Sequence, residues 1–310
     1  MSVVVVGSVN MDVVARVAHI PAPGETLLAT GTSRGGGGKG ANQAVAAARA
    51  GGARTAFVGA VGDDGDGAAL RKALADDGID LDGLVTVDAP TGAAFISVAD
   101  DGENAIVVIP GANGAFLELE PAQRALVDSA DVLLAQLEIP VATVRTAAAA
   151  RREGAVVVLN AAPSGALADE SSAAALLPEI DVLVVNEHEL LEVAGLDDRE
   201  AAIAALASRV PVLVVTLGAH GSVVVVDGVR ETVAAFRAEP VDTTGAGDTF
   251  CGVFAARLAA RPRSRRLDIR TVTDAARAGS AAAALAVGRA GAQAAVPTSR
   301  EVDALLEGAR

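Results

Sequence analysis

The sequence predicts an α/β protein with a doubly wound, mostly parallel sheet flanked by helices, and with a small β-sheet lid. Three observations support this prediction. Short, unbroken runs rich in valine alternate along the chain with alanine-rich stretches. Such runs are typical of strands buried on both faces, as in a parallel sheet. Two further regions break the alternation and carry the patterns of hairpins and half-exposed strands.

The predicted main sheet is built from six apolar runs, which helix-forming stretches separate. The runs lie at 3–6, 55–62, 131–138, 155–160, 181–187 and 211–218. The helical stretches lie at 41–51, 67–78, 141–154 and 199–209, and most of them end at glycine. Repeated βα units predict right-handed crossovers between parallel strands. Residues 246–310 are predicted to contain helices only.

The predicted lid comes from two separate regions. Residues 11–34 are weakly alternating, and residues 92–109 read as two strands joined by Asp101-Gly102, a strong hairpin signal. A flap over the crevice of an α/β sheet excludes water from a reaction. A second hairpin at 221–236 is expected to extend an edge of the main sheet. No long linker divides the chain, so a single domain over residues 1–310 is expected.

Composition narrows the class of protein. The formal net charge of −14 argues against nucleic-acid binding, which needs a basic surface. Mean hydropathy is +0.42, but charges interrupt every apolar run before it reaches the ~18 residues of a membrane span. The single cysteine, Cys251, excludes a disulfide framework within the chain. No basic leader segment precedes the first apolar run, and we therefore expect a cytoplasmic protein.

Polar residues follow most of the predicted strands. Ligands of open α/β sheets bind beyond the carboxyl ends of the strands, so these residues are candidates for a site. Each residue alone is explained equally well as a turn or cap residue, but the set together predicts a site. The set is Asn10, Asp12, Glu138, Asn160, Ser164, Asn186, Glu189, Thr216 and Gly218.

The stretch VDTTGAGDTFCG at 241–252 carries the most specific chemistry. Asp248 follows Gly245, Ala246 and Gly247 at the expected start of an apolar helix. Bare backbone N–H groups at such a start form an anion hole, and a carboxylate beside an anion hole can move a proton. The alternative is that Asp248 only complements the helix dipole.

A second glycine-rich stretch, GGGGKGAN, surrounds Lys39. It is not a Walker P-loop, because Gly40 stands where that motif has Ser or Thr. A glycine-rich turn that opens a helix can still bring its backbone close to a ligand, and Lys39 and Asn42 flank the turn. The alternative is a flexible loop before a helix. Cys251 is expected to be a small buried residue and not a nucleophile.

With these motifs in place, the chain resembles the ribokinase/PfkB carbohydrate kinase family over essentially its whole length. The most specific motifs are GGKGAN and DTTGAGDTF, and GSVNMD, PAPGE, GDDGDG, VNEHE, TLGAHG and GRAGAQAAVP follow the family order. The resemblance implies ATP-dependent phosphorylation of D-ribose at its 5-hydroxyl, giving D-ribose 5-phosphate and ADP. It implies that Asp248 is the base and that residues 245–247 (Gly245, Ala246 and Gly247) form the anion hole.

The resemblance also implies the binding residues, position by position. Those for the sugar are Asn10, Asp12, Gly38, Lys39, Asn42, Glu138 and Asp248. Those for ATP are Asn186, Glu189, Thr216, Gly218, Gly221, Gly247 and Ser280, of which Asn186 and Glu189 hold Mg²⁺ through water. Those for an activating monovalent cation, normally K⁺, are Asp242, Thr244, Ala286, Arg289 and Gly291. Ala295 stands where many relatives carry Ser, so one ligand of that cation is absent.

Other functions stay open at this point. A relative acting on deoxyribose or a nucleoside has the same motifs, although nucleoside binding usually recruits aromatic stacking, and the chain has no Trp or Tyr. A non-catalytic sugar-binding protein would be favoured by an altered Asp248 or a broken GAG, and both are intact. A dehydrogenase would need a dinucleotide fingerprint, which is absent. In the family two lids pack together, which implies a homodimer through residues 11–34 and 92–109.

Overall fold

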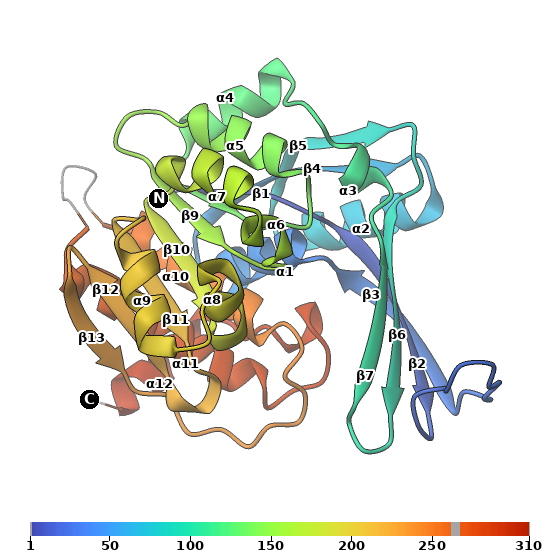
Figure 1. Cartoon of the computed structure of the whole chain (residues 1–310). Coiled ribbons are helices and arrows are strands. Elements are labelled where there is room, and N and C mark those ends of the chain that lie inside the picture. The colour runs from blue at the N-terminus through green and yellow to red at the C-terminus, as the bar shows by residue number, and fades with distance from the viewer. Residues whose placement is uncertain (1, 262–266, 310) are drawn as a thin grey trace.

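The computed structural model describes residues 2–261 and 267–309, and its centre is a nine-stranded sheet with helices on both faces (Figure 1). The predicted fold class is confirmed. The strands are β1 (Ser2–Val6), β4 (Arg54–Gly62), β5 (Asp80–Val87), β8 (Val132–Ala135), β9 (Val156–Asn160), β10 (Val182–Asn186), β11 (Val212–Thr216), β12 (Ser222–Val226) and β13 (Val229–Val233).

The strand order places a switch point in the middle of the sheet. The order is β13-β12-β11-β10-β9-β8-β1-β4-β5, and all pairs from β11 to β5 are parallel. The chain runs from β1 outward to β5 and then returns to β8 on the other side of β1. Crevices that bind ligands open at such switch points. The hairpin of β12 and β13 turns at Asp227-Gly228, both with positive φ, and extends the edge as predicted.

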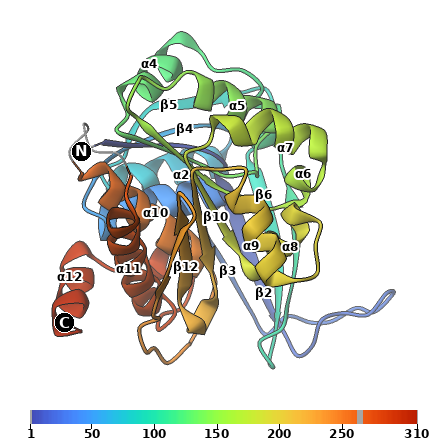
Figure 2. The ribbon, with the colours of Figure 1, turned by 60° about the vertical axis from the view of Figure 1, so that its left-hand side comes forward.

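Alternate residues of the strands face two separate layers of helices (Figures 1 and 2). In β1, Val3 and Val5 face one layer, whereas Val4 and Val6 face the other. The first layer comprises α1 (Lys39–Val45), the π-helix η1 (Ala46–Ala50), α2 (Gly65–Asp76), α10 (Ala246–Ala259), α11 (Ile269–Ala286) and α12 (Ser299–Gly308). The second comprises α3 (Ala112–Ala115), α4 (Pro121–Ser129), α5 (Val141–Ala149), α6 (Gly165–Ala168), α7 (Glu170–Leu176), α8 (Glu187–Ala194) and α9 (Arg199–Ala207).

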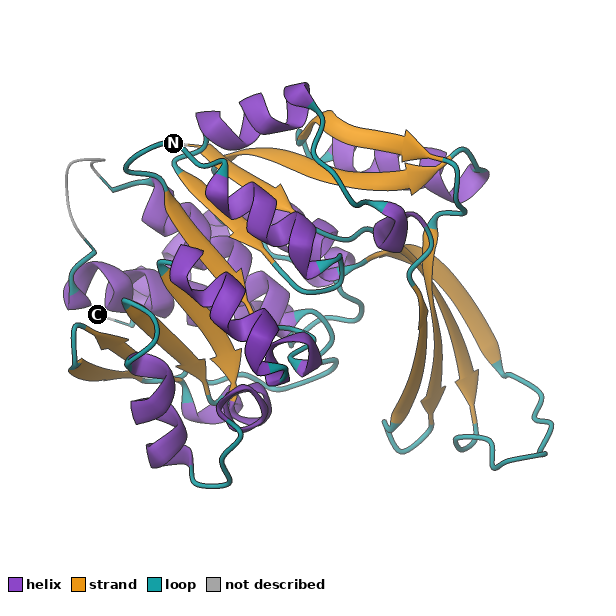
Figure 3. Cartoon of the chain, turned by 45° about the horizontal axis from the view of Figure 1, so that its top comes forward, coloured by secondary structure: helices purple, strands orange, loops and turns teal. Residues whose placement is uncertain are grey.

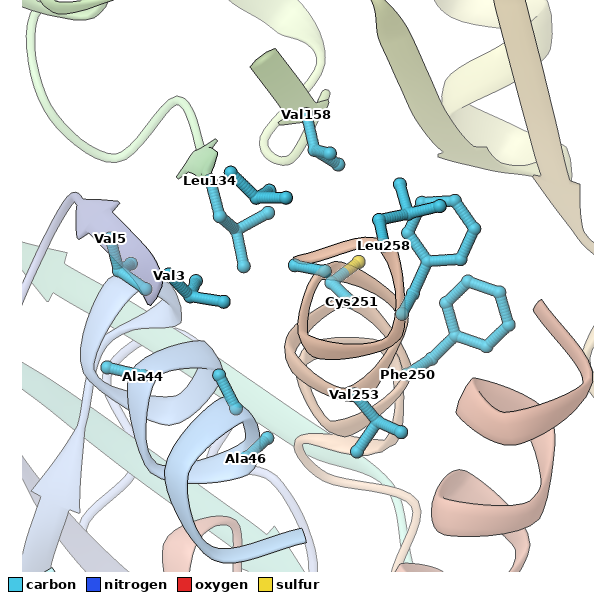
Figure 4. Close-up of a cluster of buried hydrophobic side chains, with 14 of the residues drawn as sticks. Val3, Val5, Ala44, Ala46, Leu134, Val158, Phe250, Cys251, Val253 and Leu258 are labelled. Atoms are coloured by element: carbon cyan, nitrogen blue, oxygen red, sulfur yellow. The ribbon is translucent and has the colours of Figure 1, made fainter. Parts of the chain in front are cut away.

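Helix α10 lies against the sheet near its centre, and Cys251 is buried there beside Leu134 and Val158 (Figure 4). Burial raises the pKa of the Cys251 thiol well above its usual range, which agrees with the predicted packing role. Gly252 on the same helix lets α1 approach closely, because a Cβ at this position would lie 2.4 Å from the carbonyl oxygen of Gln43. No helix in the described part of the chain is long and apolar enough to cross a membrane.

A second, four-stranded sheet projects from the main body (Figure 3). Its order is β3-β2-β6-β7, with β2 and β6 parallel and the outer pairs antiparallel. Large apolar side chains stand exposed on β6 and β7. The strands are β2 (Asn10–Val17), β3 (Gly31–Gly37), β6 (Gly92–Ala99) and β7 (Asn104–Ile109), and the exposed side chains are Phe95, Ile106, Val107, Val108 and Ile109.

Hydrogen bonds of the Asp64, Asn113 and Arg34 side chains hold this small sheet to the main body. The backbone N–H and the hydroxyl of Thr91, just before β6, both donate to Asp64, which also caps α2. The Asn113 side chain accepts from the N–H of Val9 and donates to its carbonyl, so it bonds the segment that leads into β2. Nη2 of Arg34 on β3 donates to both carboxylate oxygens of Asp66 on α2, each at 2.7 Å.

Some boundaries differ from those expected. The run at 131–138 stops being a strand after Ala135, and the run at 181–187 stops at Asn186, which caps α8. The glycine-rich stretch before Lys39 was expected to be a turn, but it lies within β3 up to Gly37, and only Gly38 turns, with φ +85°. Of the helical prediction for 246–310, residues 262–266 and 310 lie outside the described residues.

Candidate active site

The site forms where the carboxyl ends of the parallel strands meet the N-terminus of α10. Asp248 lies in the first turn of α10 and is 7% exposed. Its Oδ2 accepts a hydrogen bond from Nδ2 of Asn42 at 3.0 Å, and its Oδ1 accepts one from Nε2 of Gln43 at 2.9 Å. Both oxygens of the carboxylate are therefore held by neutral amide donors from α1.

The start of α10 exposes backbone donors next to this carboxylate. Gly245 caps the helix with φ +74°, a conformation that favours glycine. The N–H of Ala246 donates to the carbonyl oxygen of Thr243, which differs from the expected hole of three free groups. Within the described residues, the N–H groups of Gly247 and Asp248 have no acceptor. They point to an anion site at a helix N-terminus.

A cleft of about 240 Å³ opens at this point, and it is lined by residues from the ends of β9, β10 and β11 and from the starts of α1, α8 and α10. Ligand sites usually enclose ~300–1,000 Å³, so this cleft fits part of a nucleotide, such as its phosphates. The predicted residues that line it are Lys39, Asn160, Asn186, Glu189, Thr216, Gly245, Gly247 and Asp248. Thr243, which was not predicted, lines it as well.

Charges around Asp248 influence one another strongly. The carboxylate of Asp248, and to a lesser extent those of Glu138 and Glu189, raise the pKa of Lys39 although burial opposes this. Lys39 is therefore a firmly charged ammonium group in the cleft. Burial raises the pKa of Glu189, although hydrogen bonding to Asn186 and the charge of Lys39 oppose it.

The sugar-binding residues predicted from the resemblance lie on the β1 and β8 side of Asp248. The Glu138 carboxylate accepts from the Ser8 hydroxyl at 2.5 Å and from the N–H of Lys39 at 2.9 Å, so it connects the segment after β8 to the loop after β1 and to the start of α1. Asn10 Oδ1 accepts from Nδ2 of Asn113 at 2.7 Å. The buried Oδ1 of Asn42 has no hydrogen-bond partner among the described residues, which leaves an acceptor for a hydroxyl group.

Asp12 sits against the backbone of β3. A Cβ on Gly37 would lie 2.1 Å from Oδ2 of Asp12, so the carboxylate fits only because position 37 is glycine. Burial, together with the negative charges of Glu138 and Asp248, raises the pKa of Asp12 from 3.8 to about 6. A buried carboxylate with a raised pKa beside other acids is typical of a functional site.

The Asp12→Asn variant is expected to change how stability depends on pH. Between pH 3.8 and about 6 the folded parent keeps a proton on Asp12 that the unfolded chain has lost, so the Asp12 contribution to stability falls as pH rises. At ~1.4 kcal/mol per unit, the loss is on the order of 3 kcal/mol. Urea unfolding at pH 4 and pH 7 should show the variant gaining about this much relative to the parent. If the unfolding free energy changed equally with pH in the two proteins, the raised pKa of Asp12 would be contradicted.

Asn186 and Glu189 form a reciprocal cap at the start of α8. Asn186 Oδ1 accepts from the N–H of Glu189, and Glu189 Oε2 accepts from the N–H of Asn186, both at 2.8 Å. One oxygen of each side chain is thus engaged. Among the described residues, no group of three or more His, Cys, Asp or Glu side chains could hold a metal by itself. This donor set fits a Mg²⁺ ion that takes most of its ligands from phosphates and water.

Three of the predicted nucleotide residues do not line the cleft. Gly218 has φ +54° and opens a 3₁₀ turn, η3 (Gly218–His220). Gly221 has φ +89°, and a Cβ there would lie 2.0 Å from the carbonyl oxygen of Val233, so this glycine is required by the β12–β13 hairpin. Ser280 is half-buried on α11. We find no cleft contact for these residues within the described chain.

The residues predicted for a monovalent cation lie at the end of α11 and in two loops that contact each other. Asp242 accepts from the N–H of Thr244 and from the N–H of Gly291, each at 2.9 Å. Burial raises the pKa of Asp242, but these hydrogen bonds outweigh it and the pKa is lowered. The carbonyl of Ala286 accepts from the N–H of Arg289, and the side chain of Arg289 pairs with Glu301. Ala295 is buried beside this loop.

Several polar residues that hold the site are not among those predicted from the sequence. Gln43, Gln136, Asn113 and Ser8 are buried and bonded to predicted residues or to their neighbours. The available signal was polarity in an apolar context: Gln43 interrupts an alanine-rich helix, and Gln136 follows an apolar strand. Ser164, from the predicted set, instead bonds Glu192 on α8 and serves packing.

Comparisons with known proteins all find similarity to carbohydrate kinases. The sequence model of the pfkB family carbohydrate kinases matches residues 1–299. The ribokinase of Haemophilus influenzae is 40% identical over 312 residues, covering 98% of this chain and 97% of that protein. The crystal structure of ribokinase from Thermotoga maritima has a TM-score of 0.86 at 34% identity, covering 99% of both chains. The structure of Arabidopsis thaliana ribokinase complexed with ribose and ATP has a TM-score of 0.85 at 32% identity and covers 98% of both chains.

Proposed function

The chain belongs to the pfkB family of carbohydrate kinases, and from this premise we propose that it transfers the γ-phosphoryl group of ATP to the 5-hydroxyl of D-ribose. The products are D-ribose 5-phosphate and ADP. The observation that carries the proposal is the placement of the Asp248 carboxylate beside the free N–H groups of Gly247 and Asp248 in one cleft. A base and an anion site in contact are what phosphoryl transfer to a hydroxyl group requires.

The sugar occupies the β1 and β8 side of Asp248. That side offers carboxylate and amide groups to the sugar hydroxyls, from Asn10, Asp12, Asn42 and Glu138. A sugar hydroxyl can donate a hydrogen bond to Oδ1 of Asn42, which has no other partner among the described residues. The β-sheet formed by β2, β3, β6 and β7 acts as a lid over this position, within a single-domain protein. Two of its anchors, Asp64 and Asn113, bond the segments where the chain enters the lid.

In the reaction, Asp248 takes the proton of the 5-hydroxyl as the hydroxyl oxygen forms its bond to the γ-phosphorus. The bond between that phosphorus and the bridging oxygen breaks, and ADP leaves with the electron pair. The N–H groups of Gly247 and Asp248 and the dipole of α10 stabilise the charge on the transferring group. The ammonium group of Lys39 adds a full positive charge at the same place.

ATP binds with Mg²⁺, which Asn186 and Glu189 hold through water. The engagement of both side chains in the α8 cap supports water-mediated contact, since the cap leaves few oxygens for direct ligation. The ion supplies charge neutralisation for the phosphates. Thr216, which lines the same cleft, and the Gly218, Gly221 and Ser280 positions belong to the proposed nucleotide side.

K⁺ is the proposed monovalent activator. Asp242 already bridges the loop before α10 to Gly291. The carbonyl groups of Thr244, Arg289 and Gly291 lie in the two bridged loops, and that of Ala286 lies at the end of α11. Rings of carbonyl oxygens suit K⁺. The ion would stiffen the loop that carries the anion site. A cytoplasmic location, where K⁺ is abundant, is part of this proposal.

The substrate and the cation are tested together by measuring ADP release with Mg-ATP. The acceptors are ribose, deoxyribose, fructose, adenosine and no sugar, each with K⁺ or Na⁺. We expect release to require ribose and to be higher in K⁺. Preferential release with adenosine would contradict the assignment of ribose as the acceptor. We do not expect this result, because no aromatic side chain lines the described cleft to stack on a base. Equal rates in K⁺ and Na⁺ would contradict the cation site.

The lid is also the proposed surface of a homodimer. Phe95 and Val107 are cross-strand neighbours, 49% and 65% exposed, and an apolar sheet face of this kind is expected to be covered. The Val107→Lys variant should be a monomer by sedimentation velocity at micromolar concentration, where the parent is a dimer. Val229→Lys, at a position on β13 that is 54% exposed, should remain a dimer. A monomeric parent, or a dimeric Val107→Lys, would contradict the assignment.

A further inference from the structure

We propose that Gln43, oriented by Gln136, is a positioning residue that fixes the Asp248 carboxylate for proton transfer. The inference rests on the proposed function and deepens it, because it explains how the base keeps one geometry. Gln43 is fully buried and does not line the cleft, so it acts on the reaction only through the cleft residues that it bonds, Asp248 and Asn160.

Both protons of the Gln43 amide are used at the site. Nε2 of Gln43 donates to Oδ1 of Asp248 at 2.9 Å and to Oδ1 of Asn160 at 3.0 Å. Asn42, the other donor to Asp248, is assigned to the sugar, so its side chain serves two partners. Gln43 contacts no substrate, so its hydrogen bond to Asp248 stays in place whether or not the sugar is bound.

Gln136 decides which end of the Gln43 amide faces Asp248. Nε2 of Gln136 donates to Oε1 of Gln43 at 2.6 Å. Because a carbonyl oxygen can only accept, this bond directs the Nε2 end of Gln43 toward the base. A flipped Gln43 would place its oxygen against Oδ1 of Asp248 and its NH₂ against that of Gln136, and both contacts are repulsive.

Two glycines, Gly7 and Gly252, pack closely against these two glutamines. A Cβ on Gly7 would lie 2.0 Å from Oε1 of Gln136, and one on Gly252 would lie 2.4 Å from the carbonyl oxygen of Gln43. Oε1 of Gln136 is buried without a hydrogen-bond partner among the described residues. Burying an unsatisfied polar atom costs stability, so Gln136 is better explained by orienting Gln43 than by packing.

The test compares Gln43→Met, Gln136→Met and the double variant with the parent, on whichever acceptor the parent phosphorylates. Methionine keeps the length of the side chain and removes the amide. We expect kcat of Gln43→Met to fall about 10–100-fold, while KM for sugar and ATP changes less than about threefold. Gln136→Met should lose less, and the double variant should be no slower than Gln43→Met, because Gln136 acts through Gln43.

Gln123→Met is the matched control. Gln123 is also buried, and it bonds the carbonyl of Gly83 and the N–H of Glu120, away from the cleft. It should lower the melting temperature and leave kcat unchanged. A kcat for Gln43→Met within about twofold of the parent, or losses that multiply in the double variant, would overturn the inference.

A second measurement does not depend on turnover, so it separates failure of the inference from failure of the proposed function. The chain contains only four glutamines, and ¹⁵N-glutamine labelling gives a simple side-chain amide spectrum. The Gln43 signals, identified by their loss in Gln43→Met, should shift in both Asp248→Asn and Gln136→Met and stay in place in Gln123→Met. Signals unmoved in both of the first two variants would overturn the inference even if the parent were inactive on every acceptor.

Discussion

Asp248→Asn is expected to lower kcat for ribose phosphorylation by about 10²–10⁴-fold, because general-base catalysis contributes about that much. The amide has nearly the shape of the carboxylate but cannot take the 5-hydroxyl proton. Asn42 and Gln43 donate to opposite oxygens of Asp248, so the new NH₂ group leaves one of these donors without an acceptor. The measurement is kcat and KM in a coupled ADP assay, with ribose affinity measured separately by calorimetry.

The controls for Asp248→Asn concern folding and binding. The variant should bind ribose and ATP with affinities close to those of the parent, since Asp12, Glu138 and Lys39 remain in place. A kcat within about tenfold of the parent would show that the proton leaves without help from Asp248 and would contradict its assignment as base.

Gly247→Ala is expected to lower kcat/KM by about 10²-fold, comparable to the loss of an oxyanion-hole donor. A Cβ built on Gly247 meets no atom within 4 Å, so the free protein accommodates it. The methyl group would instead stand in the cleft that Gly247 and Asp248 line, where we propose that their N–H groups bind the phosphate. Alanine also favours helix more than glycine does, so the melting temperature should not fall.

Gly65→Ala is the matched control for this variant. Gly65 is likewise in the first turn of a helix, α2, and a Cβ there also meets no atom within 4 Å. It lies outside the cleft, and we expect both kcat/KM and melting temperature to stay at or above those of the parent. If Gly247→Ala retained full activity, the phosphate would not approach α10 at this turn, and the anion site would have to be elsewhere.

The parts of the fold that could be predicted are those with local causes. The valine run of β1 is buried on both faces, and the Asp227-Gly228 turn needs residues that tolerate positive φ. Strand β5 was missed because its sequence, DLDGLVTV, carries charges, which an edge strand can expose. The glycines of β3 predict a turn from sequence because glycine disfavours strands, yet Gly37 is needed where Asp12 packs against the backbone.

The residues of the candidate site also divide into those that the sequence could predict and those that it could not. Asp248, Lys39, Asn186 and Glu189 could be found from sequence because each stands at a strand end or a helix start. The glutamine pair could not, because its role depends on the close crossing of α1 and α10, which only the packing at Gly252 reveals. The engaged N–H of Ala246 likewise depends on the turn that precedes α10.

The measurement that tests the central claim most directly is ³¹P NMR of a reaction containing the protein, Mg-ATP, K⁺ and D-ribose. A phosphate ester at C5 couples to two protons, whereas an ester at C1 couples to one. The account predicts that the γ-phosphate signal of ATP is replaced by that of ADP and of a new phosphomonoester split into a triplet. A doublet would place the phosphate on another hydroxyl, and the absence of any new ester signal would contradict the assignment of this chain as a kinase of ribose.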